Sequence, residues 1–185
     1  MRGAGQADEF TELETFSLGG GAAVAADDGR VLLGTSGGRL EIRGADGERE
    51  TLDIGGGVED IAIDGYVFAV ADGDVTAYTT SGIELWSTDV TAPQRIVPVG
   101  REGVLACVTE DGHVVGIDTE TGSRLYSVER PHGDVTADST VVGGHGRVVV
   151  ASWSFLVAFD AAGEPLFDPH IGGAIEGRAS LAASV

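Results

Sequence analysis

Residues 71–86 read ADGDVTAYTTSGIELW, and this stretch decides how the chain is organised. It predicts two short strands joined by a turn at Gly82, because glycine and small polar residues separate the strands of hairpins. Trp86, one of two tryptophans in the chain, follows that glycine by four positions. This spacing of a turn glycine and an aromatic residue returns elsewhere in the chain.

The same hairpin occurs four times, and its turn glycines are spaced by 35, 40 and 41 residues. These glycines are Gly47, Gly82, Gly122 and Gly163. Four positions after them stand Thr51, Trp86, Tyr126 and Phe167. An aromatic residue therefore recurs in three units, and a threonine takes its place in the first.

Two further apolar segments precede each hairpin, so every unit holds four short strands. The second segment, such as VLACV at residues 104–108, is apolar on both faces, as in a strand buried between two sheets. We expect the third and fourth strands to alternate more and to lie nearer solvent. Four-stranded antiparallel sheets repeated at this period predict an all-β fold, a β-propeller.

The aromatic residue at the repeated position then lies on the outermost strand of a blade. A wide side chain there packs across the gap between adjacent blades. We interpret Trp86, Tyr126 and Phe167 as structural wedges, with an aromatic binding cage as the alternative.

The repeat resembles that of the PQQ-like, quinoprotein-dehydrogenase-like β-propellers. The matching features are VTAYTTSGIELW at residues 75–86 and VVGIDTETGSRLY at residues 114–126. The resemblance covers residues 19–171 and is weakest in the first unit, which lacks the aromatic residue. WD repeats fit less well, since their Gly-His and Trp-Asp dipeptides are missing at the expected places.

The resemblance implies a scaffold more than a catalyst. Enzymes of this family are far longer, bind pyrroloquinoline quinone with calcium, and carry a vicinal cysteine pair. This chain has one cysteine, so we expect no cofactor. Non-enzymatic relatives, including an outer-membrane assembly factor, use the same propeller as an interaction platform.

We place the full blades at about residues 19–54, 55–91, 92–131 and 132–171. The remaining residues, 1–18 and 172–185, would share a closing blade, which gives about five blades and removes exposed sheet edges. An open four-blade arc that dimerises into an eight-bladed ring is the alternative. A piece of a longer propeller is a third possibility, and both terminal segments could also form short helices.

Acidic residues number 30 against 11 basic ones, all of them Arg, for a net charge of −19. Molar salt screens such self-repulsion, so the composition resembles that of haloarchaeal proteins. An acidic mesophilic protein, or a GC-rich genome behind the missing lysine, is the alternative. The charge also disfavours nucleic acid and acidic lipid as partners. With no signal-like or membrane-spanning segment, we expect a soluble cytoplasmic protein.

Motifs that could carry chemistry are better explained by the repeat. Cys107 lies in an apolar run and is interpreted as a core residue. Ser36 in GTSGG matches a nucleophile elbow, but a strand follows where a helix is needed. Asp-rich fragments at residues 27–29 and 72–74 lack the ligands of a full calcium loop and read as turns. Gly triplets at residues 19–21 and 55–57 are interpreted as connectors between blades.

The histidines lack the spacing of a helical metal site. His132, His145 and Asp134 could meet at one mouth of the ring, whereas His113 and His170 stand apart. Solvated loop histidines are the simpler interpretation.

Trp153 and Phe155 form an aromatic hairpin tip without the usual Gly-Asp turn. Exposed aromatic tips mark interaction surfaces, so these two residues are the candidate partner-binding residues. A packed tip that covers a blade edge is the alternative. We therefore expect a non-catalytic scaffold that binds a protein partner or its own copy. A ligand- or metal-binding propeller, or an enzyme with an unidentified site, is the alternative.

Overall fold

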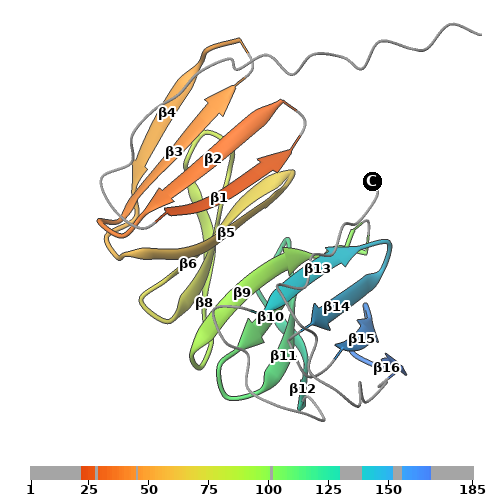
Figure 1. Cartoon of the computed structure of the whole chain (residues 1–185). Helices are drawn as coiled ribbons and strands as arrows, with labels where there is room; N and C mark the ends of the chain where they lie inside the picture. The colour runs from red at the N-terminus through yellow and green to blue at the C-terminus, as the bar shows by residue number, and fades with distance from the viewer. Residues whose placement is uncertain are drawn as a thin grey trace, which may run out of the picture.

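The computed structural model describes residues 22–27, 29–44, 46–100, 102–129, 139–151 and 156–167. This part of the chain folds into sixteen strands arranged as four sheets of four antiparallel strands. The all-β propeller class expected from the repeat is confirmed. Figure 1 shows the four sheets fanned around their first strands, in chain order from red to blue.

The strands follow one another along the chain within each sheet. Blade 1 comprises β1 (Ala22–Asp27), β2 (Arg30–Thr35), β3 (Arg39–Gly44) and β4 (Arg49–Asp53). Blade 2 comprises β5 (Val58–Asp64), β6 (Tyr66–Ala71), β7 (Asp74–Tyr78) and β8 (Glu84–Asp89). Blade 3 comprises β9 (Pro93–Pro98), β10 (Val104–Thr109), β11 (His113–Asp118) and β12 (Arg124–Glu129). Blade 4 comprises β13 (Thr140–Gly144), β14 (Arg147–Ala151), β15 (Leu156–Asp160) and β16 (Pro165–Phe167).

The second strand of a blade is buried on both faces, as its apolar sequence predicts. All six residues of β10 are buried, and so are the four central residues of β6. The expectation that third strands lie nearer solvent is wrong, because β3 and β11 bury their central residues as well. The fourth strands, such as β12, are largely exposed. Neighbouring blades cover the third strand because they pack over more than the inner half of the sheet.

Three apolar clusters hold the blades together, one at each junction between described blades. The blade 1–blade 2 cluster includes Leu32, Leu40, Val67 and Tyr78. The blade 2–blade 3 cluster includes Phe68, Trp86, Leu105 and Ile117. The blade 3–blade 4 cluster includes Ala106, Val108, Val148 and Phe159. Blades 2 and 3 thus bury one face against the sheet before them and the other against the sheet after them.

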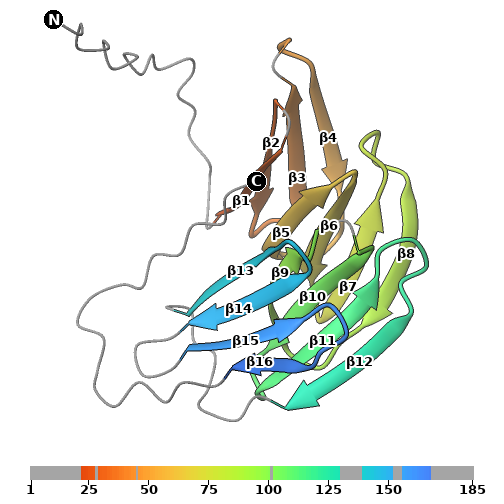
Figure 2. The same ribbon diagram turned by 90° about the vertical axis from the view of Figure 1, so that its right-hand side faces the viewer.

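The first strands are the innermost ones, and β1, β5, β9 and β13 contact one another in that order. Figure 2 shows the same succession from the side, with the later strands of each blade pointing outward. The residues proposed for a closing blade, 1–18 and 172–185, lie outside the described part, so the closure stays a prediction. Within the described residues, no helix is long and apolar enough to cross a membrane.

Candidate interaction surface at the blade junctions

The junction between blades 2 and 3 is closed by the tryptophan of the repeat. Trp86 is 9% exposed, and its indole N–H donates a hydrogen bond to the carbonyl of Thr119, 3.0 Å away. The ring lies on Gly122, where an added Cβ would come within 2.7 Å of it. Thr88 donates to the Gly122 carbonyl, at 2.7 Å, and locks the same turn.

Tyr126 repeats this arrangement one blade further on. Its ring lies against Gly163, where a Cβ would come within 2.6 Å, and its main chain pairs with Gly116. The turn glycines therefore have two reasons to be glycine. Gly122 and Gly163 have φ angles of +72° and +83°, and each also needs an empty Cβ position for the neighbouring ring. The wedge interpretation of Trp86 and Tyr126 is confirmed.

Aspartates shape these turns in the same way in blades 3 and 4. The Asp118 carboxylate accepts two hydrogen bonds from Thr121, one from Oγ1 at 2.9 Å and one from the backbone N–H of Thr121 at 2.8 Å. These bonds hold the pKa of Asp118 below its ordinary value. Asp160 accepts equivalent bonds from the N–H groups of Ala162 and Glu164. In the Asp-x-x-x-Gly and Asp-x-x-Gly turns of the repeat, the aspartate side chain thus accepts local hydrogen bonds that hold the turn, as in an Asx turn.

Blade 1 departs from the pattern, and the structure corrects which of its residues docks. Leu52, not Thr51, lies against the next turn glycine, Gly82. The other three blades have a β-bulge between their third and fourth strands, whereas β3 and β4 pair without one. The missing bulge moves the docking position one residue along the chain.

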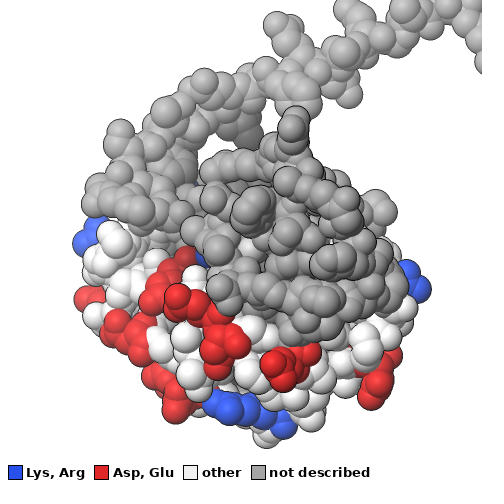
Figure 3. All heavy atoms as spheres, turned by 60° about the horizontal axis from the view of Figure 1, so that its bottom comes forward, with Lys and Arg blue, Asp and Glu red and all other residues white. Residues whose placement is uncertain are grey.

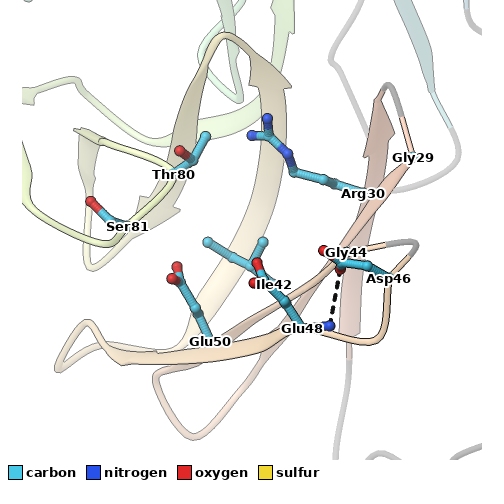
Figure 4. A pocket seen from close by; sticks show the side chains of 9 residues that line it. All are labelled: Gly29, Arg30, Ile42, Gly44, Asp46, Glu48, Glu50, Thr80 and Ser81. Carbon is cyan, nitrogen blue, oxygen red and sulfur yellow. Dashed lines mark hydrogen bonds between the residues drawn. The ribbon is translucent and has the colours of Figure 1, made fainter.

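A groove opens at the rim of this junction, with a cavity volume of about 430 Å³. The residues that line the groove are Gly29, Arg30, Ile42, Gly44, Asp46, Glu48, Glu50, Thr80 and Ser81. Figure 4 shows Arg30 and Glu50 reaching into it from blade 1, opposite Thr80 and Ser81 of blade 2. The groove is therefore polar and mostly acidic, with one cation and two hydroxyl groups.

Blade 1 also buries a carboxylate. Glu41 is 7% exposed and lies on the β3 face that points away from blade 2. Arg43 and Arg49 contact its two carboxylate oxygens at 2.5 and 2.7 Å. Burial raises the pKa of Glu41, but the hydrogen bonds and charges of the two arginines outweigh burial and lower it overall. Arg43 stands four residues before its turn glycine, and the corresponding positions of blades 2 and 4 hold Tyr78 and Phe159, which face the preceding blade.

A partly buried carboxylate links the inner strands of blades 2 and 3. Asp60 Oδ2 accepts a hydrogen bond from the backbone N–H of Ile96 at 2.8 Å. Burial raises the pKa of Asp60 to about 6, against smaller lowering effects from that bond and from Arg95. Sequence reasoning missed Asp60 and Glu41, since a single acidic residue in a strand gives no motif; the apolar neighbours of Asp60 in EDIAI were the only signal.

Cys107 lies in the same junction and is fully buried, which confirms the core interpretation. Burial, followed by the charge of Asp60, raises the pKa of the Cys107 thiol to about 12. The thiol is therefore protonated and unreactive at neutral pH.

Two further candidate motifs in the described residues are a hairpin turn next to a connector and a tight turn. Ser36 is exposed in the β2–β3 hairpin, and its carbonyl abuts Gly57 of the connector at residues 55–57. Asp72 and Gly73 form the β6–β7 turn with φ angles of +51° and +89°, the geometry of a two-residue hairpin. These features confirm the hairpin and connector interpretations of both motifs.

The histidines that the structure describes stand apart. His113, the first residue of β11, lies 3.2 Å from the carboxylate of Asp111 in the preceding turn, and His145 occupies the β13–β14 turn. The predicted companions of His145, which are His132 and Asp134, lie outside the described residues. His170, Trp153 and Phe155 also lie outside them. Among the residues that the structure describes, no group of three His, Cys, Asp or Glu side chains could hold a metal ion.

Solved structures share this fold at low sequence identity. BamB from Moraxella catarrhalis is 19% identical with a TM-score of 0.65, and the match covers 84% of this chain and 52% of BamB. The computationally designed Ika8 protein is 19% identical with a TM-score of 0.65, over 80% of this chain and 48% of that one. Apo AztD from Citrobacter koseri is 15% identical with a TM-score of 0.65, and the match covers 83% of this chain and 47% of AztD. The chain spans about half the length of these structures.

No curated protein sequence matches the chain. A family model does match, and it is described as the outer membrane protein assembly factor BamB. It aligns with residues 7–178, which include all four blades and part of each predicted closing segment. Since the model matches nearly the whole sequence, the chain belongs to the BamB-like family of PQQ-like β-propellers.

Proposed function

We propose that the chain is a non-catalytic scaffold that binds a protein partner. The observation that carries this proposal is the match of the BamB-like family model over residues 7–178. The model is described as an assembly factor, and we carry over only the general idea that such a propeller contacts other proteins. The repeated glycines, aspartates and aromatic residues act in blade packing, so they need no catalytic explanation.

The rim groove between blades 1 and 2 is the contact region that we propose. It lies where the repeat pattern fails, so its residues are not required for docking an aromatic wedge. Its carboxylates, hydroxyl groups and single arginine suit a polar segment that carries positive charge. The aromatic tip at Trp153 and Phe155 stays our second proposed contact.

Affinity capture from a native lysate of the source cells, in molar KCl, tests the groove. Reversing its charge with Glu50→Arg and Ser81→Arg should abolish recovery of a specific partner. Glu120→Arg with Ser127→Arg makes the same charge change at exposed sites of blade 3 and should leave recovery unchanged. Equal recovery with both pairs would remove the groove from the proposal. Trp153→Ala with Phe155→Ala tests the aromatic tip in the same assay.

We further propose that the protein works in the cytoplasm of a salt-adapted cell. The support is its composition, with 30 acidic residues, 11 arginines and no lysine. Fractionation of the source cells, with detection by a specific antibody, would find the protein with the cytoplasmic markers. Recovery with the membrane or the external medium would overturn the proposed location.

A further inference from the structure

The wedge aromatic of blade 2 has a counterpart in blade 1 when strand pairing, instead of distance along the chain, defines the position. Trp86 pairs with Ala77 of β7, which stands five positions before the turn glycine Gly82. In blade 1 the residue five positions before the turn glycine is Ile42, and it pairs with Glu50. Ile42 and Ala77 both face the following blade. Glu50 therefore occupies the strand position of the wedge.

The sizes of the paired residues are exchanged in blade 1. In blades 2 and 3 the residue of the third strand is small, and the Tyr126 ring takes the space that a Cβ on Gly116 would fill. In blade 1 the residue of the third strand is the larger Ile42, which is 5% exposed, and the outer residue is a glutamate. Ile42 and Glu50 both line the rim groove. The groove is therefore the ring site of this junction, and no described aromatic side chain lines it.

Blade 2 presents to the groove the kind of turn that receives the indole in blade 3. There, the Trp86 indole N–H donates to the carbonyl of Thr119. Thr119 follows Asp118, whose backbone N–H closes that turn. Thr80 follows Thr79, whose backbone N–H closes the turn of blade 2 in the same way, and Thr80 lines the groove. By this equivalence, the main-chain carbonyl of Thr80 is the acceptor for a donor in the groove.

The groove carries an excess of negative charge around this ring site. The carboxylates that line it belong to Asp46, Glu48 and Glu50. Arg30 is the one cationic residue among the lining residues. Figure 4 shows the Glu50 side chain pointing from blade 1 toward Thr80 and Ser81. An occupant with positive charge therefore suits the site better than a neutral indole.

Shape and charge together favour a guanidinium group. It is planar, like an aromatic ring, so one of its faces can lie on the side chain of Ile42. Its N–H donors lie in that plane and can reach a carboxylate and a carbonyl at the same time. The ammonium group of lysine carries the charge but lacks the flat shape. The occupant that matches the groove is therefore an arginine side chain.

We propose that the rim groove binds an arginine side chain of the protein partner, with the guanidinium in the ring site. The guanidinium lies on Ile42 and donates hydrogen bonds to the Glu50 carboxylate and to the Thr80 carbonyl. The arginine site rests on the partner binding proposed above, and it names the residue type that the groove recognises.

Nuclear magnetic resonance of the full chain in molar KCl tests which group is recognised. The probes are the N-acetyl amides of arginine, lysine and tryptophan. The arginine probe should shift the backbone amide signals of Thr80 and Ser81. It should bind about fivefold more tightly than the lysine probe, because only a guanidinium offers paired donors in one plane. Equal binding of arginine and lysine, tighter binding of tryptophan, or no shift at these amides would overturn the proposal.

A charge-removing variant locates the site. Glu50→Gln should weaken binding of the arginine probe about fivefold, because a charge-assisted hydrogen bond becomes a neutral one. Glu120→Gln makes the same change at an exposed position of blade 3 and should leave binding unaltered. Equal effects of the two variants would mean that net charge, and not this groove, attracts the probe, and would overturn the proposal.

A second variant rebuilds the wedge. Ile42→Ala with Glu50→Trp gives blade 1 the same residue pair as blade 2, so an indole should fill the ring site. Binding of the arginine probe should be lost, and the unfolding temperature should be at least that of the unaltered chain. Retained binding or a lower unfolding temperature would show that the groove is not a ring site.

The capture experiment separates the arginine site from the proposed function. Suppose that a partner is lost with Glu50→Arg and Ser81→Arg, and that the arginine and lysine probes bind equally. This result keeps partner binding and rejects arginine recognition. Selective binding of the arginine probe, with no partner recovered from the lysate, supports the site and rejects the proposed function.

Discussion

Because Gly122 has no side chain, Trp86 of blade 2 can pack directly on the backbone of blade 3. The indole of Trp86 takes the space that a Cβ would fill, and the backbone there has a positive φ. Two separate costs therefore oppose any other residue, one from packing and one from backbone conformation.

Gly122→Ala should lower the free energy of unfolding by about 2–5 kcal/mol, since about 1–2 kcal/mol comes from the left-handed backbone and about 1–3 kcal/mol from overpacking. Gly73→Ala is the matched control, with φ of +89° and no described atom within 4 Å of the new Cβ. Gly73→Ala should lower the free energy of unfolding only by the backbone contribution of about 1–2 kcal/mol. Chemical denaturation in molar KCl measures both, and equal losses would show that the contact with Trp86 carries no energy.

Asp60 makes stability depend on pH with a sign opposite to that of most carboxylates. Its pKa is raised from 3.8 to about 6 in the folded chain, so the folded state holds a proton that the unfolded state releases. The stability contribution is therefore full below pH 3.8 and falls as pH rises toward 6. The loss at neutral pH is on the order of 3 kcal/mol, from about 1.4 kcal/mol for each pH unit.

Asp60→Asn keeps an oxygen that can accept from Ile96 and removes the charge. The variant should be more stable than the original chain by about 1–3 kcal/mol at pH 8, with the difference vanishing near pH 4. Urea unfolding at both pH values provides the measurement. A variant that is less stable at pH 8 would mean that the ionised carboxylate stabilises the junction.

The outer aromatic residues are comparable elements at successive junctions, but their polar atoms differ. Trp86 has a hydrogen-bond partner at Thr119, whereas the buried hydroxyl of Tyr126 has none in the described structure. Trp86→Phe should therefore cost about 1–3 kcal/mol, because it removes ring area and orphans a carbonyl. Tyr126→Phe should be neutral or slightly stabilising. Thermal unfolding in molar KCl compares them, and an equal loss at both sites would contradict the assignment.

The repeat predicts the blades because strand, turn glycine and aromatic residue are local features of the sequence. Their register is not local, as blade 1 demonstrates. Counting four residues from Gly47 selects Thr51, yet Leu52 docks, because β3 and β4 lack the bulge of the other blades. No residue type in the hairpin indicates a missing bulge.

The candidate surface is predictable to a smaller extent. The rim groove is lined by turns of blade 1 and by Thr80 and Ser81 of blade 2. It depends on what lies across a junction, and the sequence of one unit does not contain that information. The burial of Glu41 is also unpredictable, since its partner Arg49 lies on a different strand, eight positions away.

At the scale of the whole molecule, the net negative charge is the main feature that makes stability depend on salt. The net charge is −19, and Figure 3 shows carboxylates spread over one face of the described surface, with arginines in smaller groups. Repulsion of this kind destabilises a compact state until salt screens it, and the screening length falls to about 3 Å at molar ionic strength.

The unfolding temperature should therefore rise steadily from millimolar to molar KCl. Because the effect is electrostatic screening, molar NaCl should act like KCl, whereas an equally osmotic amount of sucrose should reproduce little of the rise. Calorimetry provides the measurement. A temperature that does not change with salt would contradict the proposed adaptation to a saline cytoplasm.

Docking of a rim side chain on the next blade's turn glycine joins the blades of this fold. The proton NMR spectrum of the indole N–H groups tests it most directly, since the chain has only two tryptophans and Trp86→Phe assigns the signal. The Trp86 indole proton should exchange slowly with solvent and show nuclear Overhauser contacts to the Gly122 α-protons. Rapid exchange without such contacts would mean that the blades are not joined in this way.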